Sequence, residues 1–319
     1  MVVLVLKIMF LLDRDNDFFA RQIKNNGFDV FRIYKDISLP MKFLRRAHLY
    51  SDLNLYKYWF NEEWIKKISQ FDTIFIHASI IKVPVVKFIN NNFPNKRIIL
   101  WYWNPVRKTL PMDYTKNLDC ELWSFDPYDC KKYGLNYNTQ FYFDISKLKD
   151  SESCRNEIDV LFVGKNKGRL KKLLEIERKL ENISLRTYFH IVENSKFLKF
   201  ISVNLYNKLN YKTKYNFSES ISYENVLELI FNSNSILDIV SKGQTGLTLR
   251  PLEALYAEKK LITNDINIKT YDFYNPNNIF VLEDNNFDKI NDFLNKNYQT
   301  VDDKITEKYQ FSNWIKRFK

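Results

Sequence analysis

The stretch 235-SILDIVSKGQTGLTLRPLEALYAEKKLITND-265 decides the fold. It opens with a short apolar run at 236–240, which predicts a buried strand. A polar loop with glycines follows at 241–246, and Leu and Ala at helical spacing over 247–257 predict a helix with one buried face. A second apolar run, 260–263, predicts another strand. Strand, loop, helix and strand form a βαβ unit, in which ligands bind at the carboxyl ends of the strands.

The loop of this unit suits an anionic ligand. Gly243 and Gly246 let the backbone approach a ligand closely, and the start of the helix offers unpaired N–H groups. Lys242 and Arg250 add positive charge. Glu253 lies about one turn inside the helix, where its carboxylate can accept two hydroxyl hydrogens from a sugar diol. Phosphate at the helix end and ribose on Glu253 would make a nucleotide site. A plain turn followed by a solvated Glu remains the alternative.

The same residues resemble a known family. The pattern Gly-Gln-Thr-Gly-Leu-Thr-x-Arg-x-x-Glu-Ala-Leu at 243–255, followed by Lys-Lys-Leu-Ile-Thr-Asn, resembles the donor-site helix of GT-B glycosyltransferases. The likeness is strongest to bacterial enzymes of capsule and lipopolysaccharide assembly. It implies that Glu253 holds the nucleotide ribose. Many members carry a second Glu eight positions earlier, where this chain has Thr245, so Gln244 or Thr245 would contact the sugar instead.

A second strand and glycine loop begins at 158. The apolar run 158–164 predicts a strand, and the loop Gly164–Gly168 carries basic side chains before a helix at 170–180. The loop lacks the Gly-Lys-Ser/Thr ending of a P-loop. The Phe-Val-Gly-Lys opening resembles the first strand and loop of the GT-B donor domain. The resemblance therefore assigns donor binding to Gly164, Lys165, Arg169, Lys242, Gln244, Thr245, Gly246, Leu247, Thr248, Arg250 and Glu253.

Strands and helices alternate over the whole chain. The first 145 residues predict one Rossmann-like domain, whose final strand is expected at 140–143. A polar segment at 145–157 predicts the interdomain linker. We therefore predict an α/β protein with an acceptor domain at 1–150 and a donor domain at 151–300. The GT-B resemblance implies that the two domains face each other across a cleft and that a C-terminal helix, 301–319, returns to the first domain.

Two polar residues follow strands of the first domain. Asp13 opens the run Asp-Arg-Asp-Asn-Asp, which contains the Asp-x-Asp pattern of metal-dependent glycosyltransferases but directly precedes a predicted helix at 18. Helix capping is the favoured interpretation of this run. His77 ends the strand predicted at 72–77, where it can contact an acceptor or act as a base. A structural histidine is the favoured alternative. We assign both residues to acceptor binding.

Composition narrows the class of protein. The chain has 319 residues and a net charge of +11, which favours phosphate-rich partners such as nucleotides, anionic lipids or nucleic acid. The 3 cysteines show no metal-ligand spacing and indicate a reducing compartment. The apolar N-terminus is shorter than the ~20 residues of a membrane-spanning helix and lacks a cleavage site, so it predicts a buried strand. We expect a cytoplasmic protein.

Two segments mix aromatic and basic side chains, one at 38–70 and one at 196–214. The first could contact the acceptor or a membrane, or pack its aromatic side chains inward in an ordinary helix. The second could lie on an anionic membrane at the inner side of the cell, or form a solvated helix or loop face. Both interpretations stay open at this stage.

The sequence thus predicts a glycosyltransferase that uses a nucleotide-sugar donor and a saccharide or lipid-linked acceptor in bacterial surface polysaccharide assembly. The predicted catalytic residues are His77, Lys165 and Arg250, and no metal or other cofactor is expected. A nucleotide-sugar epimerase on the same fold is one alternative. A basic nucleic-acid-binding protein is the other, and the lack of an aromatic RNA-binding signature disfavours it.

Overall fold

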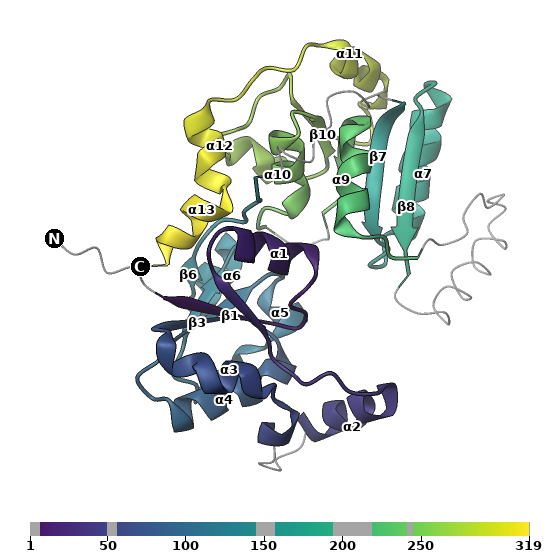
Figure 1. Ribbon diagram of the computed structural model, residues 1–319. Helices are drawn as coiled ribbons and strands as arrows, with labels where there is room; N and C mark the ends of the chain where they lie inside the picture. Colours follow the sequence, from purple (N-terminus) through teal and green to yellow (C-terminus); the bar gives the residue numbers. More distant parts are fainter. Residues whose placement is uncertain (1–6, 50–55, 145–156, 194–218, 241–244, 319) are drawn as a thin grey trace. The chain divides into compact units, whose positions relative to one another are not determined.

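The computed structural model describes residues 7–49, 56–144, 157–193, 219–240 and 245–318. By its internal contacts the chain divides into two compact units, Met1–Thr139 and Gln140–Lys319. Each unit is built on its own parallel sheet with helices on it (Figure 1). The predicted class, α/β with two Rossmann-like domains, is therefore confirmed. The boundary predicted at residue 150 lies outside the described residues.

The first unit holds a six-stranded sheet of order β2-β1-β3-β4-β5-β6, in which every paired neighbour is parallel. Its strands are β1 Ile8–Leu12, β2 Asp29–Arg32, β3 Thr73–His77, β4 Arg97–Tyr102, β5 Glu121–Ser124 and β6 Asn136–Tyr137. Its helices are α1 Phe18–Asn25, α2 Leu39–Leu49, α3 Glu62–Lys67, α4 Val83–Asn92, α5 Val106–Thr109 and α6 Pro127–Tyr133, with short 3-10 turns η1 Tyr56–Trp59, η2 Ile68–Gln70, η3 Ile80–Lys82 and η4 Met112–Tyr114.

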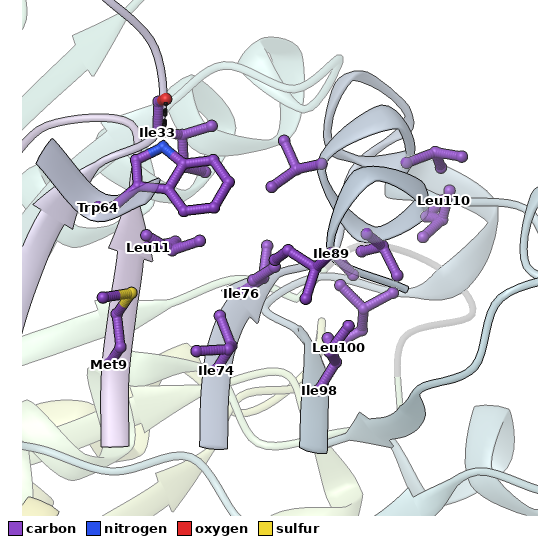
Figure 2. Packing of buried hydrophobic residues seen from close by; sticks show 14 of the residues in the cluster. Met9, Leu11, Ile33, Trp64, Ile74, Ile76, Ile89, Ile98, Leu100 and Leu110 are labelled. Atoms are coloured by element: carbon purple, nitrogen blue, oxygen red, sulfur yellow. Dashed lines mark hydrogen bonds between the residues drawn. The ribbon is translucent and has the colours of Figure 1, made fainter. Parts of the chain in front are cut away.

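One face of this sheet packs on α3 and α4 through alternate strand residues. Met9 and Leu11 of β1 lie beside Ile74 and Ile76 of β3, and all four side chains are fully buried (Figure 2). Trp64 of α3 covers them, and its indole Nε1 donates a 3.0 Å hydrogen bond to the Ile33 carbonyl. This bond satisfies the polar atom of a fully buried aromatic ring. The core thus fixes the strands whose carboxyl ends carry Asp13 and His77.

Local signals set the first helix. Asp17 caps α1 by accepting a 2.9 Å hydrogen bond from the Ala20 amide, as the capping interpretation of the acidic run predicts. Gly27 follows the helix with a φ of 84°, a conformation that glycine adopts without strain. The turn directs the chain into β2.

The second unit holds a five-stranded parallel sheet of order β11-β10-β9-β7-β8. Its strands are β7 Ile158–Lys165, β8 Thr187–Val192, β9 Ser233–Asp238, β10 Lys260–Thr263 and β11 Ile279–Val281. Its helices are α7 Leu170–Asn182, α9 Tyr223–Phe231, α10 Leu249–Tyr256, α11 Ile290–Asn295, α12 Asp303–Tyr309 and α13 Phe311–Trp314, with 3-10 turns η6 Ile266–Thr270, η7 Phe287–Lys289 and η8 Ile315–Arg317. The βαβ unit predicted over 235–265 is β9-α10-β10.

The strand predicted at 140–143 is wrong. The first sheet ends at β6, and Tyr142 instead forms an isolated bridge with Gln310. The Tyr142 amide donates to the Tyr309 carbonyl at 3.0 Å, and the Phe311 amide donates to the Tyr142 carbonyl at 2.8 Å. The apolar alternation of this segment therefore serves contacts with the C-terminal helices rather than a sheet.

The C-terminal helices pack on the same segment. Trp314 is fully buried, and its ring centroid lies 4.1 Å from that of Phe141. Phe311 contacts both Phe141 and Phe143, at centroid distances of 5.2 and 4.9 Å. The end of the chain is thereby fixed to the residues that directly follow the first unit in sequence.

Candidate functional site

Asp238 organises the carboxyl end of the second sheet. This residue ends β9 and is only 1% exposed. Its Oδ2 accepts a 2.6 Å hydrogen bond from the Thr248 hydroxyl, and its Oδ1 lies 3.1 Å from Nη1 of Arg250. A buried carboxylate needs such partners to offset its lost hydration. Asp238 thus fixes the start of α10. Sequence reasoning missed it as a site residue, although a charged residue at the end of a buried strand is a usable signal.

Arg250 connects α10 to β7. Its Nη2 donates a 2.5 Å hydrogen bond to the Val163 carbonyl. A Cβ atom at Gly164 would lie 2.3 Å from the same Nη2. Glycine at this position therefore lets the guanidinium approach the strand closely.

Arg169 reaches the same place from the loop before α7. Its Nη1 donates to the Ile239 carbonyl and its Nη2 to the Lys165 carbonyl. The guanidinium carbons of Arg169 and Arg250 lie 5.2 and 5.1 Å from the Phe162 ring centroid. Burial, and then the charge of Arg250, lower the pKa of Arg169 to about 10. Two cationic side chains therefore meet beside one buried carboxylate, an arrangement that attracts an added anion.

We call Phe162, Arg169, Asp238, Thr248 and Arg250 the second-sheet cluster. It contains three predicted donor-binding residues, Arg169, Thr248 and Arg250. Lys165 is exposed at the end of β7, beside this cluster in sequence.

Glu253 lies on the α10 helix that carries Arg250. Its side chain is 9% exposed, and its Oε1 accepts a 2.7 Å hydrogen bond from the Tyr223 hydroxyl. Burial raises the pKa of the Glu253 carboxyl, whereas the Tyr223 hydrogen bond and the charge of Arg250 oppose this rise. Tyr223 is the first residue of α9. The preceding residue, Ser222, caps this helix because its hydroxyl oxygen accepts a hydrogen bond from the Asn225 amide. Sequence reasoning missed Tyr223 because nothing local marks a residue that meets its partner 30 positions away.

The loop before α10 is described in part. Thr245 is half-buried, and Gly246 and Leu247 are buried. Leu247 is 2% exposed, so its side chain packs inside the unit and leaves only its backbone for a ligand. Lys242 and Gln244, both predicted donor-binding residues, lie outside the described residues.

The first unit brings Asp13 and His77 into a second group of polar side chains. Asp13 follows β1, and its Oδ2 lies 3.0 Å from Nζ of Lys82, which ends η3 and is only 1% exposed. His77 ends β3, and its ring lies edge-on to Trp103 at 6.3 Å. We call Asp13, His77 and Lys82 the first-sheet cluster. Lys82 was not predicted, because an isolated Lys in sequence reads as a surface residue.

Burial gives His77 an unusual state. It lowers the pKa of the imidazole to about 3, with Lys82 adding to this effect and Asp13 opposing it. The ring is therefore neutral at pH 7. Its buried Nε2 has no hydrogen-bond partner within the described residues. A buried nitrogen of this kind can take a hydrogen bond from a ligand.

Across the described ranges, no three His, Cys, Asp or Glu side chains gather in a way that could hold a metal ion. Nor does any helix in that part of the chain combine the length and apolar character needed to cross a bilayer.

Comparisons with known proteins find the fold but not a family. No protein-family model and no curated protein sequence matches the chain. Among solved structures, the lipopolysaccharide outer core galactosyltransferase WaaB in its apo form is similar with 16% identity, a TM-score of 0.52 and 98% of each chain covered. Anabaena HepE in complex with UDP and glucose is similar with 9% identity, a TM-score of 0.56 and 98% of each chain covered.

A third similar structure is an epimerase. The Methanocaldococcus jannaschii UDP-GlcNAc 2-epimerase, in complex with UDP-GlcNAc and UDP, has 14% identity and a TM-score of 0.52, with 98% of this chain and 99% of that chain covered. These identities are low, so the likeness defines the architecture alone. The chain has the GT-B fold.

Proposed function

We propose that this protein is a glycosyltransferase that moves a sugar from a nucleotide-diphosphate sugar to a saccharide or lipid-linked saccharide acceptor in bacterial surface polysaccharide assembly. The observation that carries the proposal is that Arg169 and Arg250 both lie close to the Phe162 ring, while the helix that carries Arg250 also carries the buried Glu253. The second unit thus carries cations that suit a diphosphate and, on α10, a carboxylate that suits a ribose diol. The GT-B fold supports the proposal, because sites of this fold type lie at the carboxyl ends of strands.

The donor would be held by the second unit. Arg169 and Arg250, aided by Lys165 and Lys242, would stabilise the charge that develops on the departing nucleotide diphosphate. Removing a single donor of this kind typically costs about 2.7–4 kcal/mol of transition-state stabilisation. Glu253 would accept hydrogen bonds from the ribose hydroxyls. Because side chains supply the positive charge, the proposal needs no metal ion, and turnover should persist in EDTA.

The acceptor would be held by the first unit. The neutral Nε2 of His77, which is buried and has no partner within the described residues, would accept the hydrogen bond of the attacking hydroxyl, and Asp13 would accept a second. Lys82 would hold the Asp13 carboxylate in place. A lipid-linked acceptor would bring the protein to the cytoplasmic face of the cell membrane, which its net charge of +11 favours.

A panel of nucleotides tests the donor side. The thermal midpoint of the full chain should rise with one of UDP, GDP, dTDP or CMP, because a ligand that binds only the native state stabilises it by about 2.7 kcal/mol at 100 times its Kd. UDP is the first choice, since two of the similar structures contain it. No rise with any nucleotide or its sugar derivatives would contradict the proposal.

The epimerase remains the second candidate, because one of the similar structures is an epimerase. The two activities differ in whether they need an acceptor. An epimerase converts its nucleotide sugar alone, whereas a glycosyltransferase releases little nucleotide until an acceptor is supplied. Incubation of the purified protein with a labelled nucleotide sugar and no acceptor therefore separates them: a new nucleotide sugar indicates epimerisation.

A further inference from the structure

Helix α2 exposes large apolar side chains. Leu39 is 71% exposed, Phe43 is 74% exposed and Leu44 is 56% exposed, and Leu49 is the one buried residue of this helix. Single exposed apolar residues are ordinary on protein surfaces, but several on one short helix are not. We call Leu39, Phe43 and Leu44 the α2 ridge.

Helical spacing places the ridge on one side of α2. Leu39 and Phe43 are four residues apart and therefore neighbours along the helix, whereas Leu44 lies about 100° further round it. The other side holds the helix to its unit. There the Arg45 guanidinium lies 4.6 Å from the Tyr34 ring centroid, and His48 Nδ1 accepts a 2.6 Å hydrogen bond from the Trp59 indole. Because these contacts hold the opposite side of α2, the ridge faces outward.

Positive charge lies along one edge of the ridge. Lys42 and Arg46 lie at the positions next to Leu39 and Phe43 around the helix, and α2 contains no acidic residue. Nζ of Lys42 lies 3.7 Å from the Asp36 carboxylate, and the two side chains are 42% and 71% exposed. An exposed pair of this kind is weak and does not prevent Lys42 from contacting another anion. An apolar face bordered by basic residues on one edge resembles the pattern of a helix that lies in a membrane interface.

A lipid surface fits this charge better than a second copy of the chain. In a symmetric dimer through α2, Lys42 and Arg46 of each copy would approach their equivalents, and like charges would repel. Each copy also carries a net charge of +11. An anionic lipid headgroup layer instead complements the basic residues and accepts the apolar side chains.

We propose that the α2 ridge inserts into the headgroup region of an anionic membrane, with Lys42 and Arg46 contacting lipid phosphates. The inference rests on the surface of α2 and does not require the donor site. It identifies α2 as the surface that would bring the first unit to a lipid-linked acceptor.

Vesicle co-sedimentation of the full chain tests the proposal. We expect binding to vesicles of phosphatidylglycerol and phosphatidylethanolamine, and at least tenfold weaker binding to phosphatidylcholine alone. The double variant Leu39→Ser/Phe43→Ser should lose at least tenfold in partition coefficient. The double variant Lys42→Gln/Arg46→Gln should bind anionic vesicles more weakly and lose most of the salt dependence.

A matched control removes exposed apolar groups elsewhere. Ile266 is 54% exposed and Tyr114 is 50% exposed, so Ile266→Ser/Tyr114→Ser deletes comparable surface away from α2. This control should bind vesicles like the unchanged protein, and thermal unfolding should be alike in all variants. Equal vesicle binding by the ridge variant and the control would overturn the proposal, as would a dimer in sedimentation velocity that the ridge variant abolishes.

Nucleotide binding, measured on the same samples, keeps this test separate from the enzyme proposal. A ridge variant that binds nucleotide normally but not vesicles supports the lipid surface. If the protein binds vesicles but shows no affinity for nucleotides, α2 is supported as the membrane contact and only the donor-site proposal is contradicted.

Discussion

The hydroxyl of Tyr223 donates a 2.7 Å hydrogen bond to Oε1 of Glu253, joining the first residue of α9 to the middle of α10. Both residues are largely inside the second unit, where burial disfavours the charged carboxylate. The tyrosine therefore favours the ionised form of Glu253 and fixes the orientation of its carboxylate.

Tyr223→Phe should weaken nucleotide affinity about tenfold, which corresponds to ~1.4 kcal/mol. The loss follows because a buried carboxylate oxygen is left without its donor. Titration calorimetry with the nucleotide and its 2′-deoxy analogue gives the measurement. Tyr188→Phe, which removes a hydroxyl from an exposed side chain of β8, serves as the control. Equal affinity in Tyr223→Phe and the control would contradict this role.

Gly164→Ala should displace Arg250, because the new Cβ would lie 2.3 Å from Nη2 of that side chain. Because Nη2 is the end of a flexible side chain, Arg250 can move, and the cost is that of its hydrogen bonds to Asp238 and the Val163 carbonyl, about 1.5–3 kcal/mol for a hydrogen bond of a charged group. Urea unfolding of the single variants and of Gly164→Ala/Arg250→Ala forms a double-mutant cycle. The alanine should cost much less once the arginine is gone. Additive costs would show that the two residues do not interact.

Asp13→Ala should destabilise the first unit by leaving Lys82 buried without its partner. Loss of one member of a buried pair costs about 3–5 kcal/mol, and the exposure of Asp13, 56%, lowers the expected cost to about 2 kcal/mol. Adding Lys82→Met should restore part of the stability, since it removes the unpaired charge. Denaturant unfolding measures both variants, and no recovery in the double variant would contradict the pairing.

We expect His77 to make the free energy of unfolding depend on pH in the acid range. Burial lowers its pKa to about 3, against about 6.5 in an unfolded chain, so the unfolded state binds the proton first as the pH falls. The stability that the neutral ring contributes is complete above about pH 6.5 and is lost towards pH 3, about 3 kcal/mol by pH 4. His77→Gln should lose less stability between pH 7 and pH 4, as measured by unfolding at each pH. An unchanged slope would contradict the buried neutral state.

Much of the fold follows from local signals in the sequence. Alternating apolar runs predicted the strand–helix alternation of both units, and the capping run that ends at Asp17 predicted the start of the first helix. The strand predicted at 140–143 failed because apolar alternation does not distinguish a sheet partner from the C-terminal helices. Tyr142 instead forms an isolated β-bridge with Gln310, which is far away in sequence.

The residues of the candidate site were likewise predicted only in part from the sequence. Glycine, charge and a family-like pattern marked Gly164, Arg169 and Arg250, and the structure places these residues together. The side chains that hold them, Asp238 and Tyr223, escaped because burial and long-range partners decide their roles. Those properties exist only after the chain has folded.

The central claim is that Glu253 holds the ribose of a nucleotide sugar. Calorimetric titration of the best nucleotide from the thermal panel into Glu253→Ala tests it most directly, with Glu228→Ala, an exposed residue of α9, as the control. We expect the Glu253 variant to keep its fold and lose at least tenfold in affinity, while the control binds like the unchanged protein. Unchanged affinity in a folded Glu253→Ala would contradict the account.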